Sequence, residues 1–123
     1  MTVRITPNML IWIDAKTGLE WEVVPLKKSV NWDEAMSYAE SLESGWRVPT
    51  VDELQMLLNR SKFGPVLRRD CPLPFHSSCY WSSTVYTGST RYAWYVYFGS
   101  SAAYCSNKRE KHCVYCVRDI YRG

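Results

Sequence analysis

Two short apolar segments near the start of the chain flank a polar turn. Met9–Ile13 and Leu19–Val24 enclose a turn in which Asp14 can act as a cap and Gly18 can adopt a positive φ. Side chains of a strand point to alternate faces, so each segment is expected to bury one set of residues. In the second segment Leu19, Trp21 and Val23 are expected to face the core, and Glu20 and Glu22 to face water. The pattern predicts a β-hairpin.

Helical periodicity occurs twice in the middle of the chain, each time after a capping-box signal. Asn31 is followed three residues later by Glu34, and Thr50 by Glu53. The first helix is expected to end by Gly45. Its apolar residues at helical spacing are Trp32, Ala35, Tyr38, Ala39 and Leu42. The second has the short apolar stripe Leu54, Leu57 and Leu58. The pattern therefore predicts two helices joined by a tight linker.

The second half of the chain is strand-like after an irregular stretch. Residues 61–79 have no clear period and contain several prolines, which predicts a long surface loop. Strands are expected near 80–84, 92–98, 101–106 and 112–118. In the run 92–98, alternation predicts that Trp94, Val96 and Phe98 face the core and that Tyr95 and Tyr97 face outward, with Ala93 on their side. Trp81 is also assigned to the core.

Length and charge narrow the classes of protein. The 123 residues are expected to form one domain, 1–123. A net charge of +3 without a dense basic patch argues against nucleic acid as a partner. The sequence has no run of about 20 apolar residues, so we expect no membrane insertion. The start of the chain lacks the pattern of a signal peptide.

The five cysteines offer a disulfide, a metal site or a set of buried thiols. Cys71 and Cys79 could close a short loop as a disulfide. Cys113 and Cys116 have the spacing of a zinc knuckle or redox pair, but in a strand they would point to opposite faces. We therefore expect no metal and no cofactor, and Cys116 is read as a small buried apolar residue.

Residues 81–107 contain one charged residue, Arg91, although 22% of the chain is charged. Their many Tyr, Ser and Gly residues cannot all be buried, because hydroxyl groups need partners, and the same residues dominate antibody binding loops. This composition predicts a binding surface on a rigid scaffold, with Arg91 as a possible hot-spot residue. The candidate ligand-binding residues are Tyr86, Thr87, Ser89, Arg91, Tyr95, Tyr97, Gly99, Ser100, Ala102, Tyr104, Ser106 and His112.

A set of short motifs occurs in a specific order over residues 9–118. They are Gly18-Leu-Glu-Trp21, Asn31-Trp-Asp-Glu-Ala35, Gly45-Trp-Arg-Val-Pro-Thr50, Asp52-Glu-Leu54, Tyr80-Trp-Ser-Ser-Thr84, Ala93-Trp94 and Cys116-Val-Arg118. Together they resemble the C-type-lectin-like domain at the C-terminus of bacterial collagen-like adhesins. The resemblance implies the α+β class and the C-type lectin fold, with two helices, small antiparallel sheets and long loops. In this fold one small sheet pairs the two ends of the chain and a second sheet carries the long loops.

The same family includes the variable proteins of diversity-generating retroelements, and the chain resembles one of these, with an archaeal virus as its implied source. The resemblance implies a C-terminal variable region of about 81–118, diversified at Asn codons, that binds a protein or cell-surface ligand. Lys, Glu, Gln and Met cannot be reached from an Asn codon by changes in its first two bases, and they are absent from 81–107. The residues at the matching positions can all be reached in this way: Tyr95, Tyr97, Gly99, Ser100, Ala102, Tyr104, Ser106 and His112. It also implies a location on the virion or cell surface.

The sequence departs from two other branches of this fold. Sugar-binding lectins use Glu-Pro-Asn or Trp-Asn-Asp triplets to hold calcium, and neither occurs here. Formylglycine-generating enzymes use a reactive cysteine pair, for which Cys113 and Cys116 would be the candidates, without a flanking base. No catalytic constellation is legible, so we expect a binding protein and no enzyme. A plain adhesin or structural module and the enzyme remain as alternatives.

Overall fold

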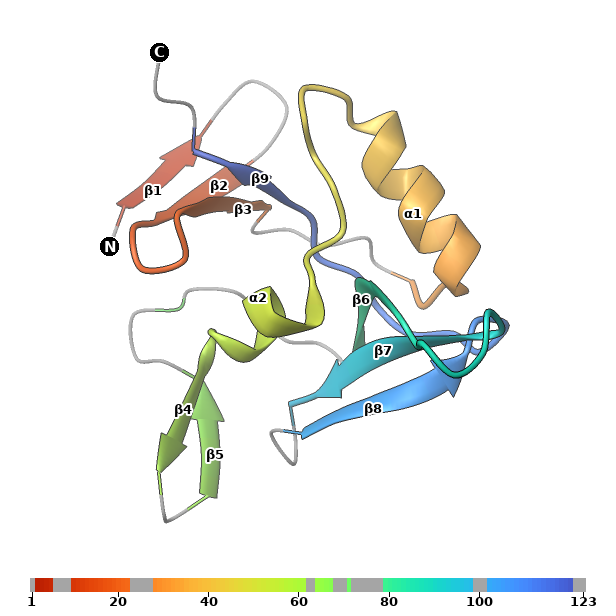
Figure 1. Ribbon diagram of the computed structural model, residues 1–123. Coiled ribbons are helices and arrows are strands. Elements are labelled where there is room, and N and C mark those ends of the chain that lie inside the picture. The colour runs from red at the N-terminus through yellow and green to blue at the C-terminus, as the bar shows by residue number, and fades with distance from the viewer. Residues whose placement is uncertain are drawn as a thin grey trace.

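The structure is a computed structural model that describes residues 2–5, 10–22, 28–61, 64–67, 71, 79–98 and 102–120. Over these residues the chain forms two helices and three antiparallel sheets, which confirms the α+β class (Figure 1). The elements are β1 (Thr2–Ile5), β2 (Leu10–Asp14), β3 (Leu19–Glu22), α1 (Trp32–Ser41), α2 (Val51–Gln55), β4 (Leu58–Ser61), β5 (Gly64–Leu67), β6 (Cys79–Val85), β7 (Tyr92–Tyr97), β8 (Ala102–Asn107) and β9 (Val117–Asp119).

A four-stranded sheet joins the two ends of the chain, as expected. Its strand order is β1-β2-β3-β9, so the last strand pairs with the third (Figure 1). The predicted turn joins β2 to β3: Gly18 has a φ of 74° and its N–H donates to the Asp14 carbonyl at 2.9 Å. The Asp14 carboxylate also accepts a bond of 2.8 Å from the Thr17 hydroxyl, which keeps this buried acid satisfied.

Both helices begin where the capping signals predict. The Asn31 side chain accepts from the Glu34 N–H at 2.8 Å, and the Glu34 side chain accepts from the Asn31 N–H at 3.0 Å. The same reciprocal pair of bonds caps α2 through Thr50 and Glu53. Helix α1 ends at Ser41, before Gly45, and α2 ends at Gln55, so Leu58 lies on β4 although it is buried as expected.

The C-terminal segment 112–119 crosses the middle of the molecule and separates two hydrophobic clusters (Figure 1). Successive side chains point to opposite sides, so Tyr115 and Val117 pack in the first cluster and Val114 and Cys116 in the second. The first cluster also holds Trp12, Leu19, Trp21, Leu54, Leu57, Leu58, Tyr80 and Val96, and the second Ile11, Val30, Ala35, Ala39, Trp46, Val48, Trp81 and Ala93. Both sides of this segment therefore face a hydrophobic core.

The prediction that Glu20 and Glu22 face water is wrong. Both are buried, at 3% and 4% exposed, because β3 is an interior strand whose second face is covered as well. The Glu20 carboxylate lies 3.2 Å from Arg118 Nε, and Glu22 Oε2 accepts a bond of 2.7 Å from the hydroxyl of Tyr38 on α1. Buried carboxylates need such partners, and a sequence pattern does not reveal them.

Two further expectations about strands fail. Part of the predicted loop 61–79 forms β5, which pairs with β4, and Pro65 is tolerated because this two-stranded sheet has only edge strands. The predicted strand 112–118 is regular only from Val117, since the segment changes partner repeatedly and makes isolated bridges through His112 and Cys113. The strands expected near 80–84, 92–98 and 101–106 correspond to β6, β7 and β8.

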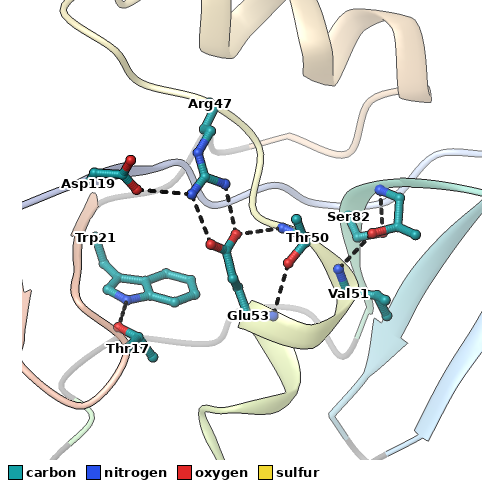
Figure 2. Close-up of polar contacts among 9 residues, drawn as sticks. Thr17, Trp21, Arg47, Thr50, Val51, Glu53, Ser82 and Asp119 are labelled. Carbon is teal, nitrogen blue, oxygen red and sulfur yellow. Dashed lines mark hydrogen bonds and ion pairs between the residues drawn. The ribbon is translucent and has the colours of Figure 1, made fainter.

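A polar network ties the linker between the helices to the last strand (Figure 2). The Arg47 guanidinium lies 2.7 and 2.8 Å from the two carboxylate oxygens of Glu53, and 3.3 Å from Asp119. The Glu53 carboxylate also accepts a bond from the Thr50 N–H in the capping box of α2. One carboxylate therefore both caps the start of the helix and binds Arg47. Its pKa is lowered, because the bonds from Arg47 and Thr50 outweigh the effect of burial.

We predict that the stability of the fold depends on the protonation of Glu22. Burial raises the pKa of Glu22 to about 7, above its ordinary value of 4.5, although the Tyr38 bond opposes the shift. The folded state therefore holds the proton more tightly than the unfolded chain. The stability present below pH 4.5 is lost as the pH rises to about 7, by up to about 3 kcal/mol. Glu22→Gln should flatten this dependence in urea titrations at pH 5 to 8.

The exposed Glu40 on the same helix as Tyr38 provides the control. Glu40→Gln should keep the pH dependence of the wild type. An equal slope of unfolding free energy against pH in the wild type and Glu22→Gln would contradict the assignment.

Candidate functional site

The three-stranded sheet β6-β7-β8 presents five of the twelve predicted binding residues on one face. Cross-strand partners share a face, and the register pairs Tyr95 with Tyr104 and Tyr97 with Ala102. Ser106 lies on the same face, and His112 packs against it from the C-terminal segment, with Nε2 3.1 Å from the Ser106 hydroxyl. We call this set the tyrosine face: Tyr95, Tyr97, Ala102, Tyr104, Ser106 and His112.

The three tyrosines of this face differ in exposure. Tyr97 and Tyr104 are 37% and 44% exposed, whereas Tyr95 is half-buried. The Tyr95 ring stacks on His112 at 4.4 Å between centroids and meets the edge of Trp81 at 6.4 Å. The expectation that Tyr95 points outward like Tyr97 is therefore only half right, because its ring forms the rim of the second hydrophobic cluster.

His112 is a structural member of the tyrosine face. Its backbone exchanges two hydrogen bonds of 2.9 Å with Val30, and its ring lies 4.6 Å from that of the buried Trp81. Burial lowers the pKa of His112, with Glu110 opposing, so the ring is neutral at neutral pH. A neutral imidazole adds no charge to the tyrosine face.

The loop residues Tyr86, Thr87, Ser89 and Arg91 do not join the tyrosine face. Tyr86 is 40% exposed, and its ring contacts those of Tyr92 and Trp94, which lie on the opposite side of β7, each at 6.4 Å. Thr87 and Arg91 are exposed, and the Ser89 hydroxyl accepts a bond of 3.2 Å from the Arg91 N–H. The predicted set thus divides between one sheet face and one end of the sheet. Gly99 and Ser100 lie outside the described residues.

The prediction that Trp94 faces the core is wrong, and for the same reason the exposed Tyr92 was not predicted as a site residue. Trp94 is half-buried, whereas Ala93, expected on the outward side, is fully buried beside Trp81. Both faces of β7 are covered over only part of their length, so the apolar set does not mark one buried side. Tyr92 has the same orientation as Trp94 and is 39% exposed.

All five cysteines lie within the described residues and carry thiols, so the disulfide considered between Cys71 and Cys79 is not formed. Cys113 packs against the first hydrophobic cluster and Cys116 belongs to the second, in agreement with the opposite-face argument. Burial raises the pKa of Cys116. The described part of the chain contains no group of three His, Cys, Asp or Glu residues placed to hold a metal.

Among the described residues, no helix is both long and apolar enough to cross a membrane.

The different burial of Tyr95 and Tyr97 predicts different costs of substitution. Tyr95→Ser removes ring contacts to His112 and Trp81 and should lower the free energy of unfolding by about 2 kcal/mol or more. Tyr97→Ser, the matched control on the same strand, should change it by less than about 1 kcal/mol. Urea titration of the two variants measures the difference. Equal losses would show that Tyr95 is as peripheral as Tyr97.

Most of the sequence matches a known protein family. Residues 11–118 match the family described as the Lcl C-terminal domain, which covers every described residue of the tyrosine face. This domain belongs to C-type-lectin-like variable proteins, which agrees with the resemblance seen in the motifs. No curated protein sequence matches the chain. Because the family match spans nearly the whole chain, the protein belongs to the Lcl C-terminal domain family.

Proposed function

We propose that this protein is a ligand-binding variable protein that recognises a protein or cell-surface target through the tyrosine face. The observation that carries the proposal is the protrusion of Tyr97 and Tyr104 from neighbouring strands whose backbones are hydrogen-bonded to each other. Tyrosine provides a large contact area with few rotatable bonds, so ordering it on binding costs little. A rigid backbone beneath adaptable side chains is the arrangement that such recognition requires.

The position of this face relative to the core supports diversification by a retroelement. Ala102, Tyr104 and Ser106 lie on the edge strand β8, and Tyr97 lies at the exposed end of β7. Substitutions there leave both hydrophobic clusters intact, so many sequences can share one framework. Tyr95 and His112 are the exceptions, because they also support Trp81.

The remaining parts of the proposal rest on the family and the resemblance. The C-type lectin fold is supported by the sheet that joins the chain ends and by two helices in the order the resemblance implies. A location on a virion or cell surface and an archaeal-virus source rest on the resemblance alone. A surface of this kind would bind its target without a metal or cofactor.

A non-diversified adhesin is the second candidate, favoured by the same exposed aromatic surface. The gene distinguishes the two. A variable protein should have a nearby reverse transcriptase and an adenine-rich near-copy of the segment encoding residues 81–118. Substitutions between sibling genes should be concentrated on the tyrosine face. Substitutions spread evenly over the surface would favour the adhesin.

We predict that the tyrosine face can be re-targeted without loss of the fold. A display library randomised at Tyr97, Ala102, Tyr104 and Ser106 should retain folded members at high frequency, because these side chains lie outside both clusters. Selection against lysozyme as a model target should yield binders with dissociation constants of about 1 μM or better. Binding is measured by titration of purified clones.

A library of equal size on the exposed side of α1 is the control, randomised at Ser37, Glu40, Ser41 and Glu43. It should yield fewer and weaker binders, since those positions lie on one convex helix and its end. Binders at equal frequency from both libraries would contradict a specialised tyrosine face.

We further propose that the protein is not an enzyme of the formylglycine-generating type. Cys116 is fully buried and burial raises its pKa, which is unfavourable for a thiolate nucleophile. In the native protein, thiol labelling of Cys116, followed by mass spectrometry, should be at least about a thousandfold slower than in urea, because it requires unfolding. Rapid labelling of Cys116 in the native protein would support the alternative that the protein is an enzyme of this type.

A further inference from the structure

A polar hollow of about 340 Å³ lies at the end of the three-stranded sheet, beside the turn that follows β8. Its walls come from the start of α1, the end of the β6–β7 loop and the turn after β8. The residues lining it are Asp33, Arg91, Asn107, Lys108 and Arg109. Three cations and one carboxylate therefore surround a space large enough for a side chain.

Backbone hydrogen bonds hold these three walls together. The Lys108 N–H donates to the Arg91 carbonyl at 2.9 Å, and the Trp32 N–H donates to the Lys108 carbonyl at 2.9 Å. The Lys108 ammonium also lies 4.2 Å from the centre of the Trp32 ring, a cation–π contact that restricts its position. The hollow is consequently built from fixed segments.

The cations of the hollow have no ion-pair partner in the described part of the chain. Arg91, Lys108 and Arg109 form no ion pair with any other described residue, and Asp33 is the one acid in the walls. Like charges gathered around a small space repel one another, and a bound anion relieves that repulsion. The Asn107 side-chain oxygen accepts from the Arg109 N–H at 2.9 Å, a bond that does not use its amide hydrogens.

The surroundings of the hollow define the anion. Tyr92 is paired with Asn107 across the strands and is exposed, as is its ring partner Tyr86, so the hollow adjoins aromatic surface. The two guanidinium groups suit the planar geometry of a carboxylate, and Asp33 disfavours an anion of higher charge. A hollow lined by five residues fits one side chain better than a polyanionic chain.

We propose that this hollow binds the carboxylate of an Asp or Glu side chain on a polypeptide ligand. The proposal rests on the ligand-binding function inferred above and adds a second contact point to it, on the opposite side of β7. The ligand would place its acidic group between Arg91 and Arg109 and pack its neighbouring residues on Tyr86 and Tyr92. Arg91 is the side chain of the predicted binding set that takes part.

The test uses the full chain labelled with ¹⁵N and two blocked peptides, Ac-Gly-Asp-Gly-NH₂ and Ac-Gly-Asn-Gly-NH₂. The Asp peptide should shift the side-chain Nε–H signals of Arg91 and Arg109 with a dissociation constant on the order of millimolar, at least about tenfold tighter than the Asn peptide. Rising salt should weaken this binding. Equal affinity for the two peptides, or no shift at these arginines, would overturn the proposal.

Two variants that each remove one cation provide the matched comparison. Arg91→Gln should weaken binding of the Asp peptide by about fivefold or more, since the Arg91 side chain lines the hollow. Lys111→Gln removes an exposed charge from the same turn but outside the hollow and should change it by less than about twofold. Both should keep a dispersed spectrum. Equal weakening of peptide binding by the two variants would show that only net charge matters and would contradict a specific carboxylate site in the hollow.

Sodium sulfate and sodium acetate at equal ionic strength distinguish the class of anion. Sulfate binding more than about tenfold tighter than acetate would assign the hollow to sulfate esters and overturn the carboxylate proposal. The outcome is separate from that of the library selection. If Arg91→Gln has no effect while the tyrosine face yields binders, the hollow fails alone. If the peptide binds and the library fails, the tyrosine face fails alone.

Discussion

The fold depends on the hydrogen bonds that the C-terminal segment 112–119 makes to strands and loops distant in sequence. His112 bonds to Val30, Cys113 bonds to β6, and Val117 exchanges two bonds of 2.8 Å with Arg47 before β9 joins β3. One extended segment thus satisfies the backbone of four other regions. Because a buried backbone group without a partner is costly, none of these regions can shift independently of the segment.

This central segment also explains how the molecule separates its framework from its binding surface. It divides the interior into two clusters, so the residues that specify the fold are already buried on either side of it. On the edge strand β8, the Tyr104 ring lies 5.9 Å from the Tyr95 ring between centroids and belongs to neither cluster. Substitutions at Tyr97, Ala102, Tyr104 and Ser106 would therefore alter the contact chemistry without changing the packing that holds β7 in place.

Several charged groups of the framework are paired, so their burial is compensated by ion pairs and ring contacts. Arg47 links Glu53 to Asp119, and Arg118 lies between Glu20 and the ring of Trp46, at 4.6 Å from the ring centre. Arg118 and Asp119 lie on β9, so their contacts connect the last strand to earlier elements and set how these elements meet. The surface cations near β8 differ, because they form no ion pair with any other described residue.

The sequence by itself determined the elements whose signals are local. The capping boxes at Asn31 and Thr50 and the Asp14–Gly18 turn depend on neighbours a few residues away, and the composition of 81–107 indicated a binding surface. Only the tertiary structure decided the burial of Glu22, the half-buried position of Tyr95 and the position of Arg91 beside the hollow. Those features arise from segments far apart in the chain, and alternation along one strand cannot show which of its faces another segment covers.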